Sequence, residues 1–352
     1  MATGTLTIDL DALLSNWKAL DALSSGAVET AAVVKADAYG MGAGKVAEKL
    51  AVNGVRSFFV ANVNEGAVVR QAVGAKPEIY IFNGHADGKT AQIRANRLTP
   101  LLNSVEQFQR HSTALAGHPF GVQLDSGMNR LGMEPADFLA VRDRVLDALP
   151  ALIISHMACA DEPDHPQNRA QLATFHAMTD GLPVRRSLAA TGGLLLGPEY
   201  HFDLVRPGIG LYGGLPFTKS QPVVHLSLPV VQVRQIGIGE TVGYGAAFRA
   251  ARPTKIATVA AGYADGLIRA LSGKATLWAG DTPCPLIGSV SMDLLTVDVT
   301  DLAKVPDQLD ILCEHQSADQ LAAVAGTIGY EILTSLGARY NRVYKGGHIT
   351  KV

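Results

Sequence analysis

Lys35 is the residue whose chemistry the sequence suggests most directly. It ends the apolar run 31–34 and precedes the segment Ala36-Asp37-Ala38-Tyr39-Gly40. An ammonium group at the end of a buried strand is costly to desolvate, so its pKa is expected to fall toward neutrality. A neutral lysine amine is a nucleophile that forms a Schiff base with an aldehyde. A surface lysine that merely ends a strand is the commoner situation, so the case for chemistry depends on the residues that meet Lys35.

Other polar residues follow short apolar runs in the same way. These residues are Asp125 with Arg130, His156, Thr191 and Arg206. Each would be costly in a protein interior unless it is paired or functional. If the runs are strands of a barrel, their carboxyl ends converge on one mouth, which is where the chemistry of such barrels takes place. We therefore expect these side chains to surround Lys35.

Two glycine-rich segments predict a phosphate site at the same mouth. Thr191-Gly192-Gly193 follows the seventh predicted strand, and Arg206-Pro207-Gly208-Ile209-Gly210 follows the eighth. Barrels often bind phosphate at these two loops through hydroxyl and main-chain N–H groups. Glycines that serve only as turns are an equally good explanation of these segments alone. A Schiff-base lysine beside a phosphate site suggests pyridoxal 5′-phosphate as the cofactor.

The elements that would position these residues alternate between strands and helices. Helical spacing of apolar residues predicts helices over 44–52, 64–73, 104–111, 135–148 and 168–179. Alternation of this kind predicts an α/β fold with an N-terminal (β/α)8 TIM-type barrel. A doubly wound sheet is the alternative, but no Gly-x-Gly-x-x-Gly fingerprint follows the first strand. The predicted strands are 32–35, 57–60, 78–82, 98–101, 120–124, 152–157, 186–189 and 202–206.

The pattern changes after about Gly214. Strand-like segments at 223–236, 255–260, 275–278, 294–299 and 308–312 are separated by Gly and Pro turns, and helical spacing returns only at 318–325 and 330–336. This pattern predicts a second, mainly β domain. We place the barrel domain at residues 1–220 and the C-terminal β-rich domain at residues 221–352.

Composition narrows the class of protein. The 352 residues are 47% hydrophobic and 18% charged, with a net charge of −2, which is typical of a globular protein and does not favour binding of nucleic acid or a membrane surface. The three cysteines are far apart and lack metal-ligand spacing. The N-terminus lacks the pattern of a signal peptide, and no apolar run is long enough to span a membrane. We expect a cytoplasmic protein without a metal.

Six motifs resemble those of one enzyme family. Val34–Gly42 closely resembles the pyridoxal-phosphate signature of bacterial alanine racemases, which are pyridoxal-phosphate enzymes of fold type III. Leu124–Gly132 and His201–Ile209 resemble two further motifs of that family. The second domain adds three more, Val242–Gly245, Gly262–Gly266 and Ser291–Asp293. The resemblance covers nearly the whole chain, in order, and includes both domains.

The resemblance implies that Lys35 holds the cofactor and then exchanges a proton on one face of the substrate Cα, while Tyr244 does so on the opposite face. A tyrosine has an ordinary pKa of about 10 and needs neighbours that lower it, a part that His156 and Arg206 would take in a hydrogen-bond chain. Arg206 would also face the pyridine nitrogen. Because a guanidinium keeps its proton, that nitrogen would stay unprotonated, which limits side reactions such as transamination.

Further roles follow from the same resemblance. Arg130 would contact the ring hydroxyl and, with Met292, place the substrate carboxylate. Tyr244 and Met292 would come from the other subunit of a head-to-tail homodimer with shared active sites. The remaining implied residues are the phosphate ligands Tyr39, Thr191, Gly208, Ile209 and Tyr344, and the residues Tyr263, Asp161 and Arg269 along the substrate access path.

The implied activity is interconversion of L- and D-alanine, either for peptidoglycan synthesis or for alanine catabolism. A racemase of broader specificity, a decarboxylase on the same barrel and a non-catalytic carrier of the cofactor are the alternatives. Three positions depart from many relatives. Gln123 replaces a carbamylated lysine and could accept a hydrogen bond from Arg130, Ala190 replaces an asparagine, and Ser289 replaces an arginine of the access path.

Overall fold

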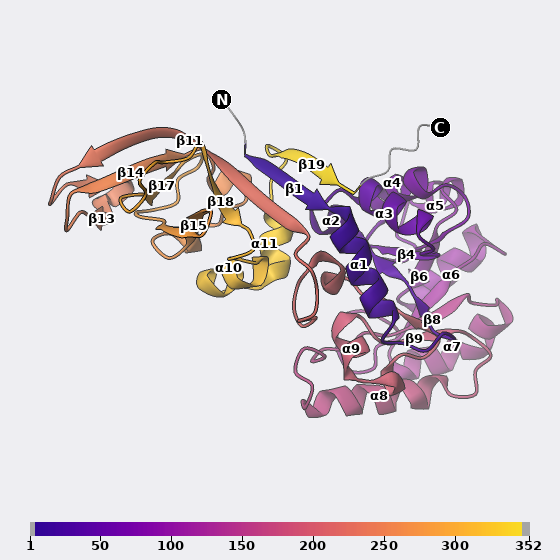
Figure 1. Ribbon diagram of the computed structural model, residues 1–352. Helices are drawn as coiled ribbons and strands as arrows, with labels where there is room; N and C mark the ends of the chain where they lie inside the picture. Colours follow the sequence, from indigo (N-terminus) through magenta and orange to yellow (C-terminus); the bar gives the residue numbers. More distant parts are fainter. Residues whose placement is uncertain (1–3, 347–352) are drawn as a thin grey trace. The chain divides into compact units, whose positions relative to one another are not determined.

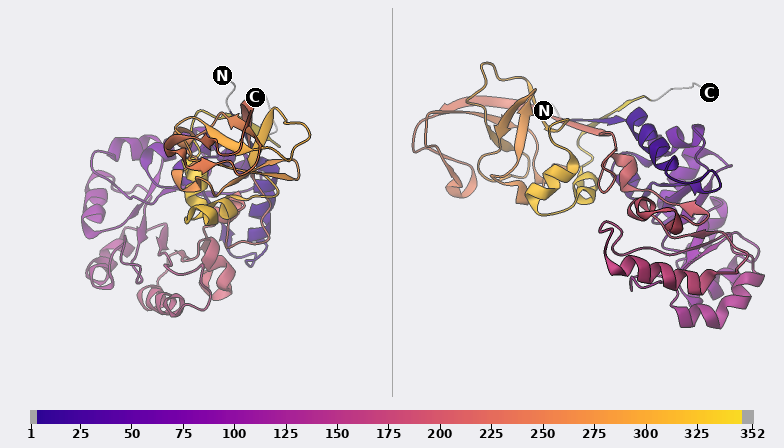
Figure 2. Two further views of the ribbon diagram at one scale, coloured as in Figure 1. Left: turned by 90° about the vertical axis from the view of Figure 1, so that its left-hand side faces the viewer. Right: turned by 60° about the horizontal axis from the view of Figure 1, so that its bottom comes forward.

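The computed structural model describes residues 4–346, which form two compact units. One unit comprises residues 14–211 and 216–220, and the other comprises residues 4–13, 212–215 and 221–346. Figures 1 and 2 show the helices and strands of each unit. Within the described residues, no helix has both the length and the apolar character that a membrane span requires.

The larger unit is built on parallel strands that follow one another in chain order. Seven of them form one sheet, which runs from β3 to β9. Consistent with strands covered on both faces, every residue of β4 and β6 is buried. The seven are β3 (Ala32–Val33), β4 (Ser57–Val60), β5 (Glu78–Ile81), β6 (Thr99–Leu102), β7 (Gly121–Gln123), β8 (Leu152–Ile154) and β9 (Arg186–Ser187).

An eighth strand closes this sheet into a barrel. β10 (Leu204–Val205) pairs in parallel with β2 (Glu29–Thr30), which directly precedes β3. The Val33 N–H continues this pairing by donating to the Pro207 oxygen at 3.0 Å, and on the other side, toward β9, the Arg206 N–H donates to the Ala189 oxygen at 2.9 Å. Each of the eight predicted strands therefore overlaps a strand of the structure, and the predicted TIM-type barrel is confirmed.

Helices connect consecutive strands and lie outside them (Figures 1 and 2). The five predicted helices are present, with capping groups at several starts. Asn62 and Ser104 accept hydrogen bonds from N–H groups of the first turns of α4 and α6, and Pro135 and Pro166 begin α7 and α8. The predicted helices are α3 (Ala43–Val52), α4 (Val63–Val73), α6 (Val105–Ala114), α7 (Pro135–Asp147) and α8 (Pro166–Thr179). The sequence did not predict α1 (Leu10–Asp21), α5 (Thr90–Ala95) or α9 (Thr191–Leu196).

The smaller unit is mainly β, as predicted. Its eight-stranded sheet is centred on the long strand β11 (Val224–Ile236), which pairs antiparallel with β1 (Thr5–Asp9), β14 (Thr254–Val259) and β18 (Gln308–Leu312). The sheet also contains β15 (Thr276–Ala279), β16 (Thr282–Pro285), β17 (Leu295–Asp298) and β19 (Asn341–Lys345). A separate hairpin of β12 (Thr241–Val242) and β13 (Phe248–Arg249) and the helices α10 (Ala318–Ala325) and α11 (Gly329–Ser335) complete it.

β1 joins the C-terminal sheet, whereas the sequence pattern predicts that the N-terminus belongs to the barrel domain. It pairs antiparallel with β11 and parallel with β19, which lie more than 200 residues away in the sequence. Residues 4–13 therefore fall in the smaller unit. The domain boundary at residues 220 and 221 stays a prediction.

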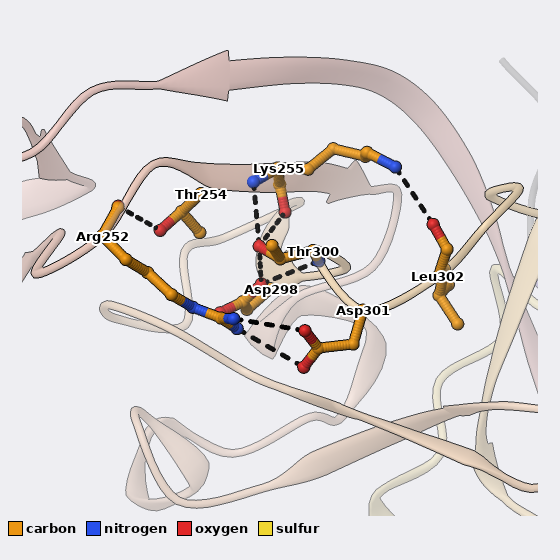
Figure 3. A network of polar contacts seen from close by, with 7 residues as sticks. All are labelled: Arg252, Thr254, Lys255, Asp298, Thr300, Asp301 and Leu302. Carbon is orange, nitrogen blue, oxygen red and sulfur yellow. Dashed lines mark hydrogen bonds and ion pairs between the residues drawn. The ribbon is translucent and has the colours of Figure 1, made fainter.

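A polar network ties the start of β14 to the loop that follows β17 (Figure 3). The Lys255 N–H donates to Thr300 Oγ1 at 2.9 Å, and the Thr300 hydroxyl donates to Asp298 Oδ1 at 2.5 Å. Arg252 forms ion pairs with Asp301 at 3.2 Å and with Asp298 at 3.6 Å. The network fixes one end of the β14–β17 pair, and no residue predicted for the site belongs to it.

Candidate active site

Lys35 begins a turn of unusual backbone conformation. The sequence predicted that Lys35 ends a strand, but β3 ends at Val33 and Lys35 is the first residue of α2 (Lys35–Tyr39). The next four residues, Ala36 to Tyr39, have φ between 52° and 55°. Left-handed conformation costs a non-glycine residue about 1–2 kcal/mol, and such strain gathers at functional sites.

Local hydrogen bonds hold this turn. The Gly40 N–H donates to the Ala36 oxygen at 2.8 Å, and the Ala43 N–H donates to Asp37 Oδ1 at 2.7 Å. Gly40 ends the turn in the left-handed region, which glycine adopts readily. The turn therefore leads directly into α3, and Lys35 sits on a fixed backbone.

The surroundings of Lys35 favour its neutral form. Burial lowers the pKa of Lys35 most, the charge of Arg130 lowers it further, and the charge of Glu65 opposes both. Lys35 is exposed to solvent in the single chain, and its Nζ lies 5.6 Å from the centre of the Phe82 ring. The direction of this pKa shift agrees with the expectation from the sequence.

Arg206 is buried without an acidic partner. It is 2% exposed, and among the described residues no carboxylate forms an ion pair with it. Its guanidinium donates to the oxygen of Ser155 at 2.7 Å, to the hydroxyl of Ser187 and to the oxygen of Leu188 at 3.3 Å. Burial lowers the pKa of Arg206 to about 9. These bonds fix the guanidinium but leave its charge unneutralised.

His156 lies among three cations. Burial, followed by the charges of Arg206, Arg130 and Lys35, lowers the pKa of His156 to about 3. The structure therefore brings together four of the six residues that the sequence placed at the strand ends. The bonds of Arg206 go to main-chain oxygens and to Ser187, so the implied His156–Arg206 hydrogen bond is not formed between these described residues. A neutral histidine beside two arginines and a lysine makes a site for an anion.

The two glycine-rich loops meet beside these residues. The hydroxyl of Thr191 accepts hydrogen bonds from the N–H groups of Gly208 at 3.0 Å and of Gly210 at 3.3 Å. A Cβ added to Gly208 would lie 2.4 Å from the hydroxyl of Tyr39, so that hydroxyl sits directly against the Gly208 backbone. Hydroxyl and N–H groups gathered at one point form the kind of cradle that binds phosphate. Ile209 follows in the same loop and is buried.

Arg130 lies in a loop that Asp125 shapes. Asp125 Oδ1 accepts from the N–H groups of Gly127 at 2.7 Å and of Met128 at 2.9 Å. Gln123 supports the same loop by donating from its side-chain amide to the oxygen of Leu131 at 3.1 Å. Its other amide atom, Oε1, is buried without a hydrogen-bond partner, so the expected bond from Arg130 to Gln123 is absent from the described structure.

In the smaller unit, the loops that carry Tyr263 and Met292 are joined. The Tyr263 N–H donates to the oxygen of Ser291, and the Ala264 N–H donates to that of Met292, both at 3.0 Å. Arg339 spans the two loops, with bonds to Asp265 at 2.6 and 2.7 Å and to Asp293 at 2.8 Å.

Tyr244, Met292 and Tyr263 are large side chains that are exposed in the single chain, with exposed fractions of 79%, 53% and 42%.

The remaining predicted site residues lie in both units. Arg269 lies on the short helix Arg269–Leu271, and its oxygen accepts from the Ser272 hydroxyl at 2.6 Å. Tyr344 lies on β19, opposite Ile8 of β1. Asp161 belongs to the barrel, where its Oδ1 would lie 2.7 Å from a Cβ added to Gly192, and burial raises its pKa.

The sequence did not predict the two serines that bind Arg206. It also did not predict that Gln171 and Glu65, on two barrel helices, bind the backbone near His156 and Lys35. Gln171 of α8 donates to the oxygen of His156 at 2.9 Å and accepts from the Ala158 N–H at 2.8 Å. Glu65 of α4 accepts from the N–H of Ala36, next to Lys35. The Asn62-x-x-Glu65 pattern of a helix start was the one signal that could have drawn attention to Glu65.

Comparison with protein families identifies the fold and the group to which it belongs. Residues 8–216 match the family model described as "Alanine racemase, N-terminal domain", and residues 223–344 match "Alanine racemase, C-terminal domain". The chain belongs to the alanine racemase family. Together the two matches include every residue predicted for the site.

Curated relatives are similar over almost the whole chain. An alanine racemase of Cereibacter sphaeroides (strain ATCC 17025) is 64% identical across 98% of this chain and 99% of its own length. One from Jannaschia sp. (strain CCS1) is also 64% identical, across 97% of this chain and 99% of its own length.

Solved structures of the family share the architecture. Alanine racemase from Bartonella henselae, described with covalently bound pyridoxal phosphate, superposes with a TM-score of 0.93 at 36% identity, covering 98% of this chain and 100% of its own. The biosynthetic alanine racemase of Pseudomonas aeruginosa gives a TM-score of 0.91 at 36% identity with the same coverage. The barrel and the C-terminal β domain are thus both features of the family.

Proposed function

We propose that this protein is an alanine racemase that interconverts L- and D-alanine with pyridoxal 5′-phosphate as its cofactor. The observation that carries the proposal is the cluster of Lys35, Arg130 and Arg206 around His156. Two arginines and a lysine, beside a cradle of hydroxyl and N–H groups, suit a ligand with a phosphate and a carboxylate. Full-length identity of 64% to curated alanine racemases supports the same activity.

The residues of the barrel mouth fit this cofactor. Thr191, Tyr39, Gly208 and Ile209, with Tyr344, would hold its phosphate. The fit is supported by the close approach of the Tyr39 hydroxyl to Gly208 and by the hydroxyl of Thr191 between two loop N–H groups. Lys35 would bind it covalently, with Arg206 at its ring nitrogen and Arg130 at its ring hydroxyl. When bound, pyridoxal phosphate supplies the electron sink that acidifies the Cα–H bond of an amino acid.

The chain's own residues would then move the proton. Lys35 Nζ, whose pKa is lowered by burial, would take or return it on one face of Cα. Tyr244 would do the same on the opposite face, because racemisation needs a proton to leave one face and reach the other. Arg130 would orient the substrate carboxylate together with Met292.

We also propose that the enzyme is a cytoplasmic homodimer with shared active sites. Tyr244 and Met292 would reach the site of the partner subunit, which is supported by their large exposed fractions in the single chain. Tyr263, Asp161 and Arg269 would line the substrate access path. The three cysteines are free thiols, as is usual in a reducing compartment.

Chiral product analysis of the purified enzyme tests the activity. Incubation with L-alanine should yield D-alanine, and the bound cofactor should absorb visible light. Lys35→Ala should remove both the absorbance and the activity, while Lys45→Ala, which alters an exposed lysine of α3, should change neither. Racemisation by Lys35→Ala without an added amine would refute the assignment.

Isotope exchange tests the second acid–base group. Tyr244→Ala should impair exchange of the Cα hydrogen of one alanine enantiomer more than that of the other, because one face loses its proton donor. Tyr330→Phe serves as the control, because this tyrosine lies on α11 and is not among the residues proposed for the site. An equal loss of exchange for both enantiomers would reject the two-base mechanism.

A further inference from the structure

Glu65 of α4 uses both carboxylate oxygens to bind the backbone beside Lys35. Oε1 accepts from the N–H of Ala36 at 2.9 Å, and Oε2 accepts from the N–H of Ala61 at 2.7 Å. Ala36 directly follows Lys35 and begins the left-handed turn. Ala61 directly follows β4, the strand that neighbours β3. The half-buried carboxylate therefore joins the ends of two adjacent barrel strands at the lysine.

Helix capping does not account for this arrangement. Asn62 is the N-cap of α4, and its side chain already accepts from the N–H groups of Asn64 at 3.0 Å and Glu65 at 3.1 Å. In a capping box, a glutamate at the position of Glu65 would accept from the N-cap N–H. Glu65 instead accepts from Ala61, one residue earlier, and from Ala36, which is 29 residues away in the sequence. The hydrogen bond from the Ala36 N–H contributes nothing to the start of α4.

The bond to Ala36 opposes the strain of the turn. Four consecutive non-glycine residues in the left-handed region persist only where surrounding contacts impose that conformation. A charged acceptor makes a stronger hydrogen bond than a neutral one, and Glu65 places it on the first strained residue. Without this bond, the backbone after Lys35 can relax toward ordinary conformations, which would redirect the lysine side chain.

We propose that Glu65 is a positioning residue for Lys35: its carboxylate fixes the left-handed turn and thereby aims the Lys35 amine at the cofactor carbon. This inference rests on the proposed function. The charge of Glu65 has a second effect, because it favours the protonated form of Lys35 against burial and Arg130. The charged groups that act on Lys35 are Arg130, which lowers its pKa, and Glu65, which raises it.

Capture of pyridoxal phosphate by the cofactor-free protein tests the proposal separately from catalysis. The adduct is trapped with borohydride at intervals between pH 5.5 and 9, and mass spectrometry measures its yield at Lys35. Glu65→Gln should slow capture by about tenfold at the high-pH plateau, because one charged hydrogen bond is lost. The acid limb of its profile should also move to lower pH, since removing the negative charge lowers the pKa of Lys35 further.

Two variants complete the design. Glu65→Asp keeps the charge but is one methylene too short to reach both N–H groups, so it should slow capture without moving the acid limb. Glu48→Gln, on the exposed face of α3, should behave as wild type. Comparison of Glu65→Asp with Glu65→Gln separates the geometric effect of Glu65 from its charge effect.

Two results would overturn the inference alone. One is a Glu65→Gln variant with the wild-type capture rate and pH profile, in a wild-type enzyme that racemises alanine. The other is a variant that melts at lower temperature yet captures the cofactor normally while folded, which would make Glu65 merely structural. Absence of any adduct at Lys35 in the wild-type protein would instead refute the proposed function, and this inference with it.

Discussion

Arg206 follows β10 and donates a hydrogen bond to the main-chain oxygen of Ser155, which follows β8, at 2.7 Å, so a buried guanidinium is held by the end of a barrel strand two positions away and not by an acid. Its remaining bonds reach Ser187 and Leu188. Removing a buried charge from water is costly, and burial lowers the pKa of Arg206 to about 9. A charge retained under these conditions without a counter-ion is available to a ligand.

We expect Arg206→Gln to change the outcome of the reaction as well as its rate. Arg206 is proposed to face the ring nitrogen of the cofactor, so loss of its charge would let that nitrogen gain a proton more readily, which would favour transamination over racemisation. Racemisation should fall by at least about tenfold, which corresponds to about 1.4 kcal/mol of transition-state stabilisation. The fraction of alanine converted to pyruvate, measured with a coupled assay, should rise.

Arg206→Lys is the companion variant, because it keeps a charge but cannot bridge three acceptors. It should lose racemisation without the gain in pyruvate. Arg142→Gln, at an exposed position of α7, is the control. An unchanged pyruvate fraction in Arg206→Gln would contradict the role assigned to the charge.

Gly208 allows a direct test of the phosphate cradle. A Cβ at this position would approach the Tyr39 hydroxyl to 2.4 Å, so Gly208→Ala must displace one of the two. We expect the Kd of the cofactor, measured by equilibrium dialysis, to rise by at least about tenfold, or about 1.4 kcal/mol. Gly26→Ala adds its methyl group where no atom lies within 4 Å and should bind normally.

Removing the hydroxyl should relieve part of the clash. The double variant Gly208→Ala/Tyr39→Phe should therefore bind the cofactor better than a sum of the two single effects predicts, which is a coupling that a double-mutant cycle measures. Simple additivity of the two effects would mean that Tyr39 and Gly208 do not form one cradle.

The barrel could be predicted from the sequence because its signals are local. The strands are short apolar runs, several of the following helices have a cap or a proline at their start, and the order of elements admits few topologies. Polar residues at the strand ends then pointed to the mouth, and Lys35, Arg130, His156 and Arg206 do lie together there. The roles of the site residues remain predictions.

Features that depend on distant contacts could not be predicted in this way. The left-handed turn at 36–39 contains no glycine, and the bonds that hold it come partly from Glu65 in the next helix. β1 has the alternation of any strand, but its partners β11 and β19 lie far along the chain. Tyr244 carries no local mark of chemistry, and only the resemblance to a family singled it out.

Arg339 should matter for substrate binding although it lies outside every predicted motif. Its fork binds both oxygens of Asp265 and one of Asp293, and so joins the loops of Tyr263 and Met292. Arg339→Lys keeps the charge but loses the two-pronged geometry. We expect kcat/KM for alanine to fall by about tenfold, mainly through KM, because small displacements of positioning residues are costly.

Arg252→Lys is a matched control for this clamp. Arg252 also pairs with two aspartates of the smaller unit, but it lies in the network of Figure 3 and touches neither loop. Both variants should lower the melting temperature slightly, and only Arg339→Lys should raise KM. If the two variants had the same steady-state kinetics, the clamp would have no part in substrate binding.

His111 makes the stability of the barrel depend on pH. It is buried on α6 beside His85 and His118, and its Nδ1 has no hydrogen-bond partner, so a proton there would bring an uncompensated charge. Burial lowers its pKa to about 4 from an ordinary value of 6.5. The unfolded chain therefore binds the proton first as the pH falls. The contribution of neutral His111 is fully present above pH 6.5 and is lost progressively toward pH 4, which amounts to about 2 kcal/mol by pH 5.

Urea unfolding of wild type and His111→Gln at pH 7 and pH 5 measures this dependence. The glutamine amide can still donate to the His118 oxygen, which the His111 ring contacts at 3.1 Å, but it does not titrate. The decrease in unfolding free energy from pH 7 to pH 5 should be smaller in the variant by about 2 kcal/mol. His176→Gln, at an exposed position of α8, is the comparison variant. Equal pH dependence in wild type and His111→Gln would show that His111 does not set the acid sensitivity of the barrel.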